Sequence, residues 1–101
     1  MEYKINSTPE ATEILLSGRM TFSDHEKFRN VIATFDGQKG HQMVFDLSGL
    51  DFVDSSGLGM LIIARDIAQK KSLTFCLRGA RDDVQRVMKV AKFNKMFTII
   101  D

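Results

Sequence analysis

The short apolar run at residues 43–47 (Met-Val-Phe-Asp-Leu) constrains the fold of this chain more than any other feature. It is bounded by polar turns, and a run of this kind is typical of a strand that is buried on both faces of a sheet. A half-exposed strand would instead alternate between apolar and polar residues. We therefore expect residues 43–47 to form the central strand of a sheet with other layers packed on it.

Strand and helix patterns alternate along the rest of the chain. Residues 3–6 and 13–19 are predicted as two strands joined by a turn that contains Pro9. Ser23 and Glu26 match a capping box, and the helical spacing that follows predicts a helix ending near Gly37. The remaining predicted elements are a helix at 55–71, a strand at 73–77, a helix that opens with Asp82 and Asp83, and a closing strand at 97–100.

This order of elements predicts an α/β fold. Strands that alternate with helices require crossover connections, so the helices should pack on one side of a mixed, largely parallel sheet of four to five strands. The sequence shows no internal repeat, no low-complexity tract and no linker. We therefore expect one domain that spans residues 1–101.

Composition excludes several classes of function. The chain of 101 residues is 44% hydrophobic and 27% charged, which is ordinary for a soluble domain, and its net charge is +1. Because basic and acidic residues are evenly mixed, no basic face is available to bind nucleic acid. Cys76 is the single cysteine, so thiols can form neither a disulfide framework nor a metal cluster. We expect no cofactor and no metal.

The sequence also predicts a cytoplasmic protein. The first six residues show neither an apolar run after the charges nor a cleavage site for secretion. The longest apolar run, residues 58–64, is far shorter than the ~20 residues that a membrane span needs, so we expect no membrane insertion.

Residues 54–59 (Asp-Ser-Ser-Gly-Leu-Gly) lie between the predicted central strand and the predicted second helix. Backbone N–H groups at a helix start are unpaired and the dipole is positive there, so Asp54, Ser55 or Ser56 can cap the helix and an added phosphate would be held locally. Gly57 and Gly59 each lower helix propensity by about 1 kcal/mol relative to Ala. That cost indicates either a close approach of a partner to the backbone or tight packing of the helix on the sheet.

The predicted second helix also carries two aliphatic residues among polar ones. Successive residues of a helix are rotated by about 100°, so the residues that face the core lie on one arc of this helix and the polar residues lie on the opposite arc. Leu58 and Ile62 fall on the polar arc, one turn apart and beside the serines. They form either a docking patch or a pair covered by a neighbouring loop. The core-facing arc consists of Met60, Leu61, Ala64, Ile67 and Ala68.

The segment 54–59 after an apolar strand resembles the signature of the STAS-domain anti-sigma factor antagonists, a bacterial regulatory family. Gly18 near the end of the second strand, the strand that contains Asp46, and the closing strand at 97–100 fit that family in order and spacing. The resemblance implies that the unmodified form, expected to be a monomer when free, binds a serine kinase/anti-sigma factor of the ATP-binding switch type. It implies release of that partner when Ser55 is phosphorylated, with Ser56 as the alternative acceptor, and reversal by a PP2C-type serine phosphatase.

Residues 18–21 (Gly-Arg-Met-Thr) differ from the acidic stretch that family members often carry there, in a loop that helps form the docking surface of the family. Lys92 stands where a glycine commonly follows the third helix. The partner-binding residues implied by the resemblance are Asp54, Ser55, Ser56, Gly57, Leu58, Gly59, Ile62, Met20 and Thr21.

Three other functions are conceivable for residues 54–59. An enzyme would need Ser55 or Ser56 as nucleophile with His25 or His41 as base, but the G-x-S-x-G spacing of a nucleophile elbow is missing, and so is a phosphate-binding Gly-Lys loop. We therefore expect no catalytic activity. The main alternative is a non-switching STAS subunit of a transport or other multi-protein assembly. A weaker one is a receptor that binds a small ligand at the helix start near Gly57.

Overall fold

Five strands form one sheet in the computed structural model, which describes residues 1–36 and 39–100. The strands follow the order β1-β2-β3-β4-β5, so neighbours in the chain are neighbours in the sheet. The elements are β1 (Glu2–Ser7), β2 (Ala11–Met20), the short 3-10 helix η1 (Phe22–Asp24), α1 (His25–Ile32), β3 (Gln42–Val53), α2 (Ser55–Lys70), β4 (Thr74–Arg78), α3 (Asp82–Val90), α4 (Phe93–Met96) and β5 (Thr98–Ile100).

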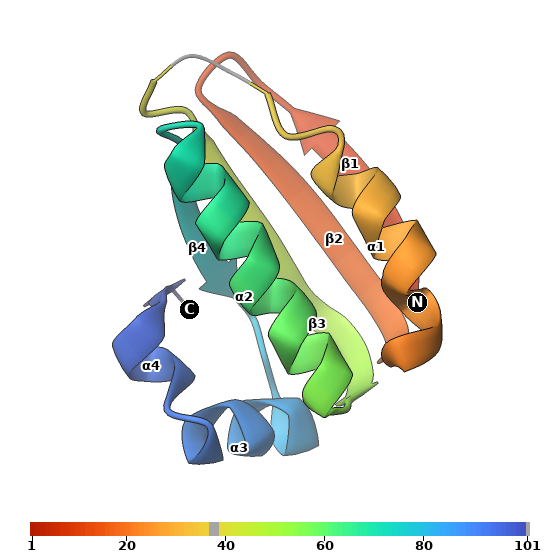
Figure 1. The fold of residues 1–101 in the computed structure, drawn as a ribbon. Helices are drawn as coiled ribbons and strands as arrows, with labels where there is room; N and C mark the ends of the chain where they lie inside the picture. The colour runs from red at the N-terminus through yellow and green to blue at the C-terminus, as the bar shows by residue number, and fades with distance from the viewer. Residues whose placement is uncertain (37–38, 101) are drawn as a thin grey trace.

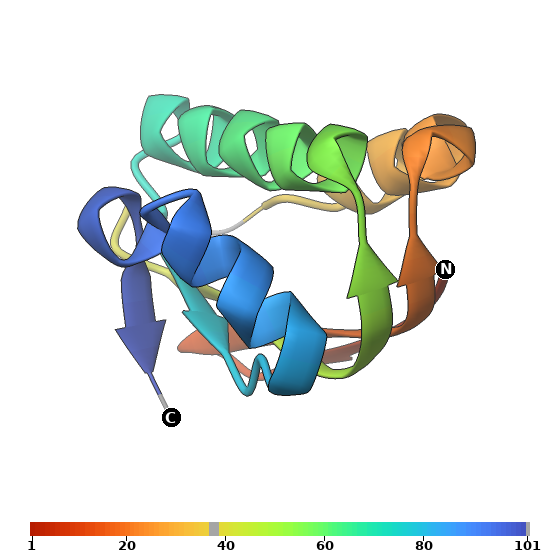
Figure 2. The same cartoon turned by 90° about the horizontal axis from the view of Figure 1, so that it is seen from below.

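The sheet is mixed and largely parallel, as predicted. β1 and β2 form an antiparallel hairpin, whereas β2, β3, β4 and β5 pair in parallel. The helices α1 and α2 lie side by side on one face of the sheet, and α3 and α4 lie beyond α2 toward the β4–β5 edge (Figures 1 and 2). None of the helices in the described ranges is long and apolar enough to cross a membrane.

The core lies between the sheet and these helices, with Phe45 of β3 at its centre. Phe45 is fully buried, and its ring lies 5.1–5.9 Å from those of Phe28, Phe35 and Phe75. Because side chains alternate along a strand, Met43 and Leu47 point to the same face as Phe45 and are also fully buried. The prediction that residues 43–47 form the central strand is confirmed.

The entry to α1 differs from the sequence prediction. The capping box is not Ser23–Glu26 but Thr21–Asp24, two residues earlier, because the chain first makes the 3-10 turn η1. The helix α1 then ends at Ile32. Gly37, the predicted end, lies outside the described residues. The short helix α4 was not predicted either.

Lys92 lies in a backbone conformation that favours glycine. It adopts φ 61° and ψ 34°, in the left-handed region, between α3 and α4. A side chain with a Cβ is disfavoured in that conformation by roughly 1–2 kcal/mol. The departure from the family pattern at Lys92 therefore concerns local backbone strain and not the functional surface.

Asp46 lies on the face of β3 that points away from α1 and α2, where it pairs with Arg78. Its Oδ2 accepts a hydrogen bond from Arg78 Nε at 3.1 Å, and its Oδ1 accepts from Ser48 N at 2.9 Å. Arg78 also reaches Glu13 Oε2 at 3.3 Å. Burial alone would raise the pKa of Asp46, but the hydrogen bonds from Ser48 and Arg78 outweigh it, so the pKa is lowered.

The lowered pKa of Asp46 predicts a specific loss of stability in acid. The unfolded chain binds a proton at this carboxyl more readily than the folded one, so the free energy of unfolding should fall as pH drops below about 4 through the folded pKa. Asp46→Asn should lower stability by about 1–2 kcal/mol at neutral pH and flatten this slope. Urea unfolding between pH 2.5 and 7 measures both. Asp51→Asn, an exposed carboxylate on the same strand, should retain the slope; an unchanged slope in Asp46→Asn would contradict the assignment.

Candidate functional site

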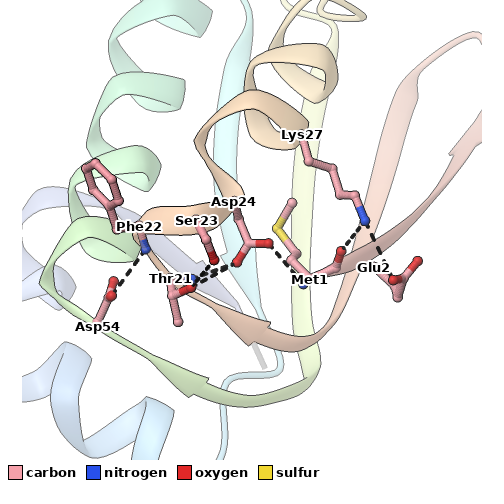
Figure 3. A network of polar contacts seen from close by, with 8 residues as sticks. All are labelled: Met1, Glu2, Thr21, Phe22, Ser23, Asp24, Lys27 and Asp54. Atoms are coloured by element: carbon pink, nitrogen blue, oxygen red, sulfur yellow. Dashed lines mark hydrogen bonds and ion pairs between the residues drawn. The ribbon is translucent and has the colours of Figure 1, made fainter.

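Asp54 ties the start of α2 to the loop between β2 and η1. Its Oδ1 accepts a hydrogen bond from Gly57 N at 2.8 Å, which makes it the N-cap of α2. Its Oδ2 accepts from Phe22 N at 3.2 Å (Figure 3), and its own N–H donates to the carbonyl oxygen of Met20. Both carboxylate oxygens are thus engaged, so Asp54 acts as a clamp between two segments that are far apart in sequence.

The loop that Asp54 holds is itself fixed by Asp24. The N–H of Thr21 donates to Asp24 Oδ2 at 2.8 Å, and the N–H of Asp24 donates to the Thr21 carbonyl oxygen at 2.9 Å (Figure 3). The terminal ammonium of Met1 lies 3.1 Å from Asp24 Oδ1. Burial alone would raise the pKa of Asp24. The hydrogen bonds from Thr21 and the contact with the ammonium lower this pKa by a larger amount, so the net shift is downward. This network holds Phe22 beside the start of α2.

The two serines differ in exposure. Ser55 is the first residue of α2 and is exposed, whereas Ser56 is half-buried. Within residues 1–36 and 39–100, neither hydroxyl takes part in a hydrogen bond. The Ser55 hydroxyl is therefore open to solvent and unbonded at a helix start, where backbone N–H groups favour an added anion.

Gly57 and Gly59 have different surroundings. A Cβ at position 57 would lie 2.5 Å from Val53 Cγ2 and 2.7 Å from the Met20 carbonyl oxygen, so only glycine fits there. A Cβ at position 59 would meet nothing within 4 Å. Tight packing of the helix on the sheet therefore explains Gly57, while the space over Gly59 is open.

The predicted docking patch on α2 needs correction. Leu58 and Ile62 are half-buried and pack against the core, and Ile63 is the exposed aliphatic residue of this helix, at 48%. The physical reason is that α2 is covered on two flanks: α1 lies along one, and on the other Arg65 reaches the Met96 carbonyl oxygen and the Phe97 ring. The open stripe that remains runs along Ser55, Gly59, Ile63 and Asp66.

The structure also shows how the predicted partner-binding residues Met20 and Thr21 lie. Met20 is fully buried, like Gly57, so neither presents a side chain to a partner. Thr21 is half-buried and occupied by the capping network. The residue that projects from this loop is Phe22, with 70% of its surface exposed. Sequence reasoning missed Phe22, although a large aromatic residue next to a predicted helix cap was a visible signal.

A groove runs between α1 and α2 from the edge of Phe22. It has a volume of about 240 Å³ and is lined by His25, Phe28, Arg29, Ile32, Met60, Ile63 and Ile67. The ring of Phe22 meets that of His25 edge-on at 5.0 Å, which makes Phe22 continuous with the groove. We call Phe22, Ile63 and this groove the α1–α2 surface. Its chemistry is apolar, with Arg29 and His25 at its border.

A second exposed aromatic residue lies at the ends of β2 and β3. Arg19 pairs in register with Phe52, and its guanidinium carbon is 4.3 Å from the centre of the Phe52 ring. A cation over the face of an aromatic ring at an exposed site contributes about 0.5–1 kcal/mol. Arg19 belongs to the stretch 18–21 and lies near the end of β2.

The histidines do not form a catalytic pair with the serines. His41 is held at the far end of the sheet: its Nδ1–H donates to the Pro9 carbonyl oxygen at 3.2 Å, and its Nε2 lies 2.9 Å from Thr12 Oγ1. His25 contacts Phe22. Among the hydrogen bonds of the described residues, none joins a histidine to Ser55 or Ser56.

Comparison with known proteins agrees with this architecture. The family model of the STAS domain matches residues 2–101. A STAS-domain containing protein of Pseudomonas aeruginosa (strain UCBPP-PA14) is 29% identical over 86 residues, which are 85% of this chain and 84% of that protein.

Solved structures share the fold at lower identity. An anti-sigma-factor antagonist (STAS) domain protein from Planctomyces limnophilus superposes with a TM-score of 0.83 at 17% identity, over 96% of this chain and 87% of that chain. The anti-sigma factor antagonist SpoIIAA in its unphosphorylated form gives 0.72 at 18% identity (99% and 88%), and the phosphorylated form from Bacillus gives 0.66 at 15% (99% and 92%). A sulfate transporter family protein from Wolinella succinogenes gives 0.72 at 14% (86% and 70%).

The resemblance stated from the sequence is therefore confirmed at the level of the family. The matched residues take in the whole sheet, the clamp at Asp54 and the serines at the start of α2. The chain belongs to the STAS-domain family.

Proposed function

We propose that this chain is an anti-sigma factor antagonist controlled by phosphorylation. Its unmodified form binds a serine kinase/anti-sigma factor of the ATP-binding switch type in the cytoplasm, and phosphorylation of Ser55 releases that partner. The observation that carries the proposal is the exposed, unbonded hydroxyl of Ser55 next to Asp54, whose carboxylate holds the loop of the exposed Phe22 through the Phe22 N–H. SpoIIAA, a structural neighbour, is known in unphosphorylated and phosphorylated forms, which supports the same kind of control here.

Charge and desolvation together account for the switch. Phosphoserine adds about −1.5 to −2 charge at neutral pH. In this chain the charge would be placed next to Asp54 and on the stripe that leads to Ile63, a surface that must lose water to bind. Burial of an uncompensated dianion is very costly, so docking is opposed. The first turn of α2 can hold the phosphate locally, so the domain need not refold.

Phosphate transfer tests the proposal directly. We expect incubation with the partner kinase and ATP to add one phosphate, measured by intact mass, and a PP2C-type phosphatase to remove it. Ser55→Ala should gain no phosphate, whereas the matched variant Ser56→Ala should gain one. Absence of phosphate on the wild-type chain after exposure to an active partner kinase would refute the switch, and loss of the phosphate in Ser56→Ala alone would move the acceptor to Ser56.

Phe22 should be a major binding residue of the same surface. Phe22→Ala removes an aromatic anchor that is 70% exposed, so we expect affinity for the kinase to fall by about thirtyfold, or about 2 kcal/mol, without loss of stability. Val90→Ala is the matched control, because Val90 is a 79% exposed apolar residue of α3. Titration calorimetry measures both. Equal affinities for the two variants would place the partner elsewhere.

The alternative function is a non-switching subunit of a transport assembly. It is favoured by the fold shared with the sulfate transporter family protein. It predicts a stable complex whose affinity does not change when Ser55 is substituted. The phosphate experiment separates the two, because a permanent subunit gains no phosphate.

A further inference from the structure

A second groove lies on different elements from the Ser55 site. It has a volume of about 360 Å³ and is formed by the β4–α3 loop, α3, α4 and β5. Figure 2 shows α4 beside β5 and α3 running from α4 toward β3. Because β4 and β5 are parallel, the groove opens at the carboxyl ends of two parallel strands. Its volume falls in the range of small-molecule pockets.

The inside of this groove is apolar. Met88 of α3 is 97% buried (3% exposed) and lines the groove, so it forms the floor. Ala80 lies at one end, and Ile99 and Ile100 of β5 form a wall. Both isoleucines keep about two fifths of their surface exposed, at 42% and 39%, which is a large apolar area for a solvated strand. An apolar ligand body would remove this area from water.

The rim of the groove is polar and carries positive charge. Lys89 and Gln85 of α3 and Asn94 of α4 line it, and among the described lining residues none is acidic. Within the described part of the chain, none of these three side chains has a hydrogen bond or an ion pair. By contrast, the nearby acidic residues Asp82 and Asp83 are already paired with arginines. An ammonium and two amide groups therefore remain free to donate to an anion.

We infer that this groove binds a small amphipathic anion, namely a carboxylate with an aliphatic body. The aliphatic body lies against Met88, Ile99 and Ile100, and the carboxylate accepts hydrogen bonds from Lys89 and Asn94. Charge decides between ligand classes here: a cation would face Lys89 with no acidic side chain among the described lining residues to offset it, and a neutral alkane or alcohol would make no charge-assisted hydrogen bond with the ammonium. The inference does not depend on Ser55.

Titration of the isotope-labelled protein with octanoate tests this assignment, with 1-octanol and acetate as matched probes. We expect octanoate to shift the backbone amide signals of residues 79–80, 85–89, 94 and 99–100. Octanol has the body without the charge and should bind about tenfold more weakly, because a charge-assisted hydrogen bond contributes roughly that factor. Acetate has the charge without the body and should not bind.

Two variants complete the test. Lys89→Gln should weaken octanoate binding by about tenfold and leave octanol unchanged, while Lys95→Gln, an exposed lysine of α4 outside the groove, should change neither. Ala80→Leu should fill the groove and block both ligands, with circular dichroism confirming the fold. No binding of octanoate by the wild type, equal binding by Lys89→Gln, or shifts that map to the α1–α2 surface would overturn the assignment.

Discussion

Phosphorylation of Ser55 is expected to lower the affinity for the partner kinase by about 10⁴-fold, or about 5.5 kcal/mol, enough to turn 99:1 bound into 1:99. Ser55 is exposed on the open stripe of α2, and Asp54 is adjacent. The phosphate therefore adds charge where the partner must remove water. Titration calorimetry of the phosphorylated and unmodified proteins, separated by ion exchange, measures the difference.

Variants of Ser55 sharpen the same experiment. Ser55→Ala should bind like the unmodified protein, because the hydroxyl has no hydrogen bond to lose in the described residues. Ser55→Asp supplies one charge in place of two and should weaken binding only in part. Backbone amide shifts of the phosphorylated protein should stay unchanged outside residues 51–65, since the fold is retained. Equal recovery of the partner by wild type, Ser55→Ala and Ser55→Asp would remove the mechanism.

Gly57→Ala is expected to destabilise the domain by about 2 kcal/mol, which corresponds to a melting temperature roughly 10 °C lower. The added methyl would lie 2.7 Å from the Met20 carbonyl oxygen, which cannot retreat freely because it accepts the N–H of Asp54 at 3.2 Å. The gain in helix propensity of about 1 kcal/mol offsets only part of the free-energy cost of this overlap. Thermal unfolding followed by circular dichroism measures the change.

Gly59→Ala is the matched control on the same helix. Its methyl meets open space, so the gain in helix propensity should raise stability by up to about 1 kcal/mol. The same variant shows whether the partner approaches this backbone closely: weaker binding together with higher stability would mean that it does. Changes of the same sign in both glycine variants would contradict the packing explanation for Gly57.

Local patterns were sufficient for the outline of the fold because they reflect the backbone directly. The apolar run around Phe45, the hairpin turn at Pro9 and the acidic start of α3 each depend on neighbours in the chain, and each element was found where predicted. The boundaries of the elements matched the prediction less closely. The capping box is Thr21–Asp24 and not Ser23–Glu26, although both pairs have the same spacing, and Asp24 also pairs with the Met1 ammonium, a contact that local spacing cannot reveal.

The surface of the site depends on neighbours that are distant in sequence. Helical spacing placed Leu58 and Ile62 outward, but helical spacing treats one helix alone and cannot include α1 on one flank or Phe97 on the other. The same limit hid Phe22, whose position follows from its hydrogen bond to Asp54, 32 residues away.

The sequence by itself determined the α/β class, the central strand and the Asp-Ser-Ser-Gly segment at a helix start, because these follow from periodicity and from the chemistry of adjacent residues. The folded structure was needed to learn that Ser55 is more exposed than Ser56, that Ile63 is exposed on the same helix, that Phe22 is tied to Asp54, and that Gly57 serves packing. The physical reason is that exposure is set by what other segments cover, and those segments meet only when the chain is folded.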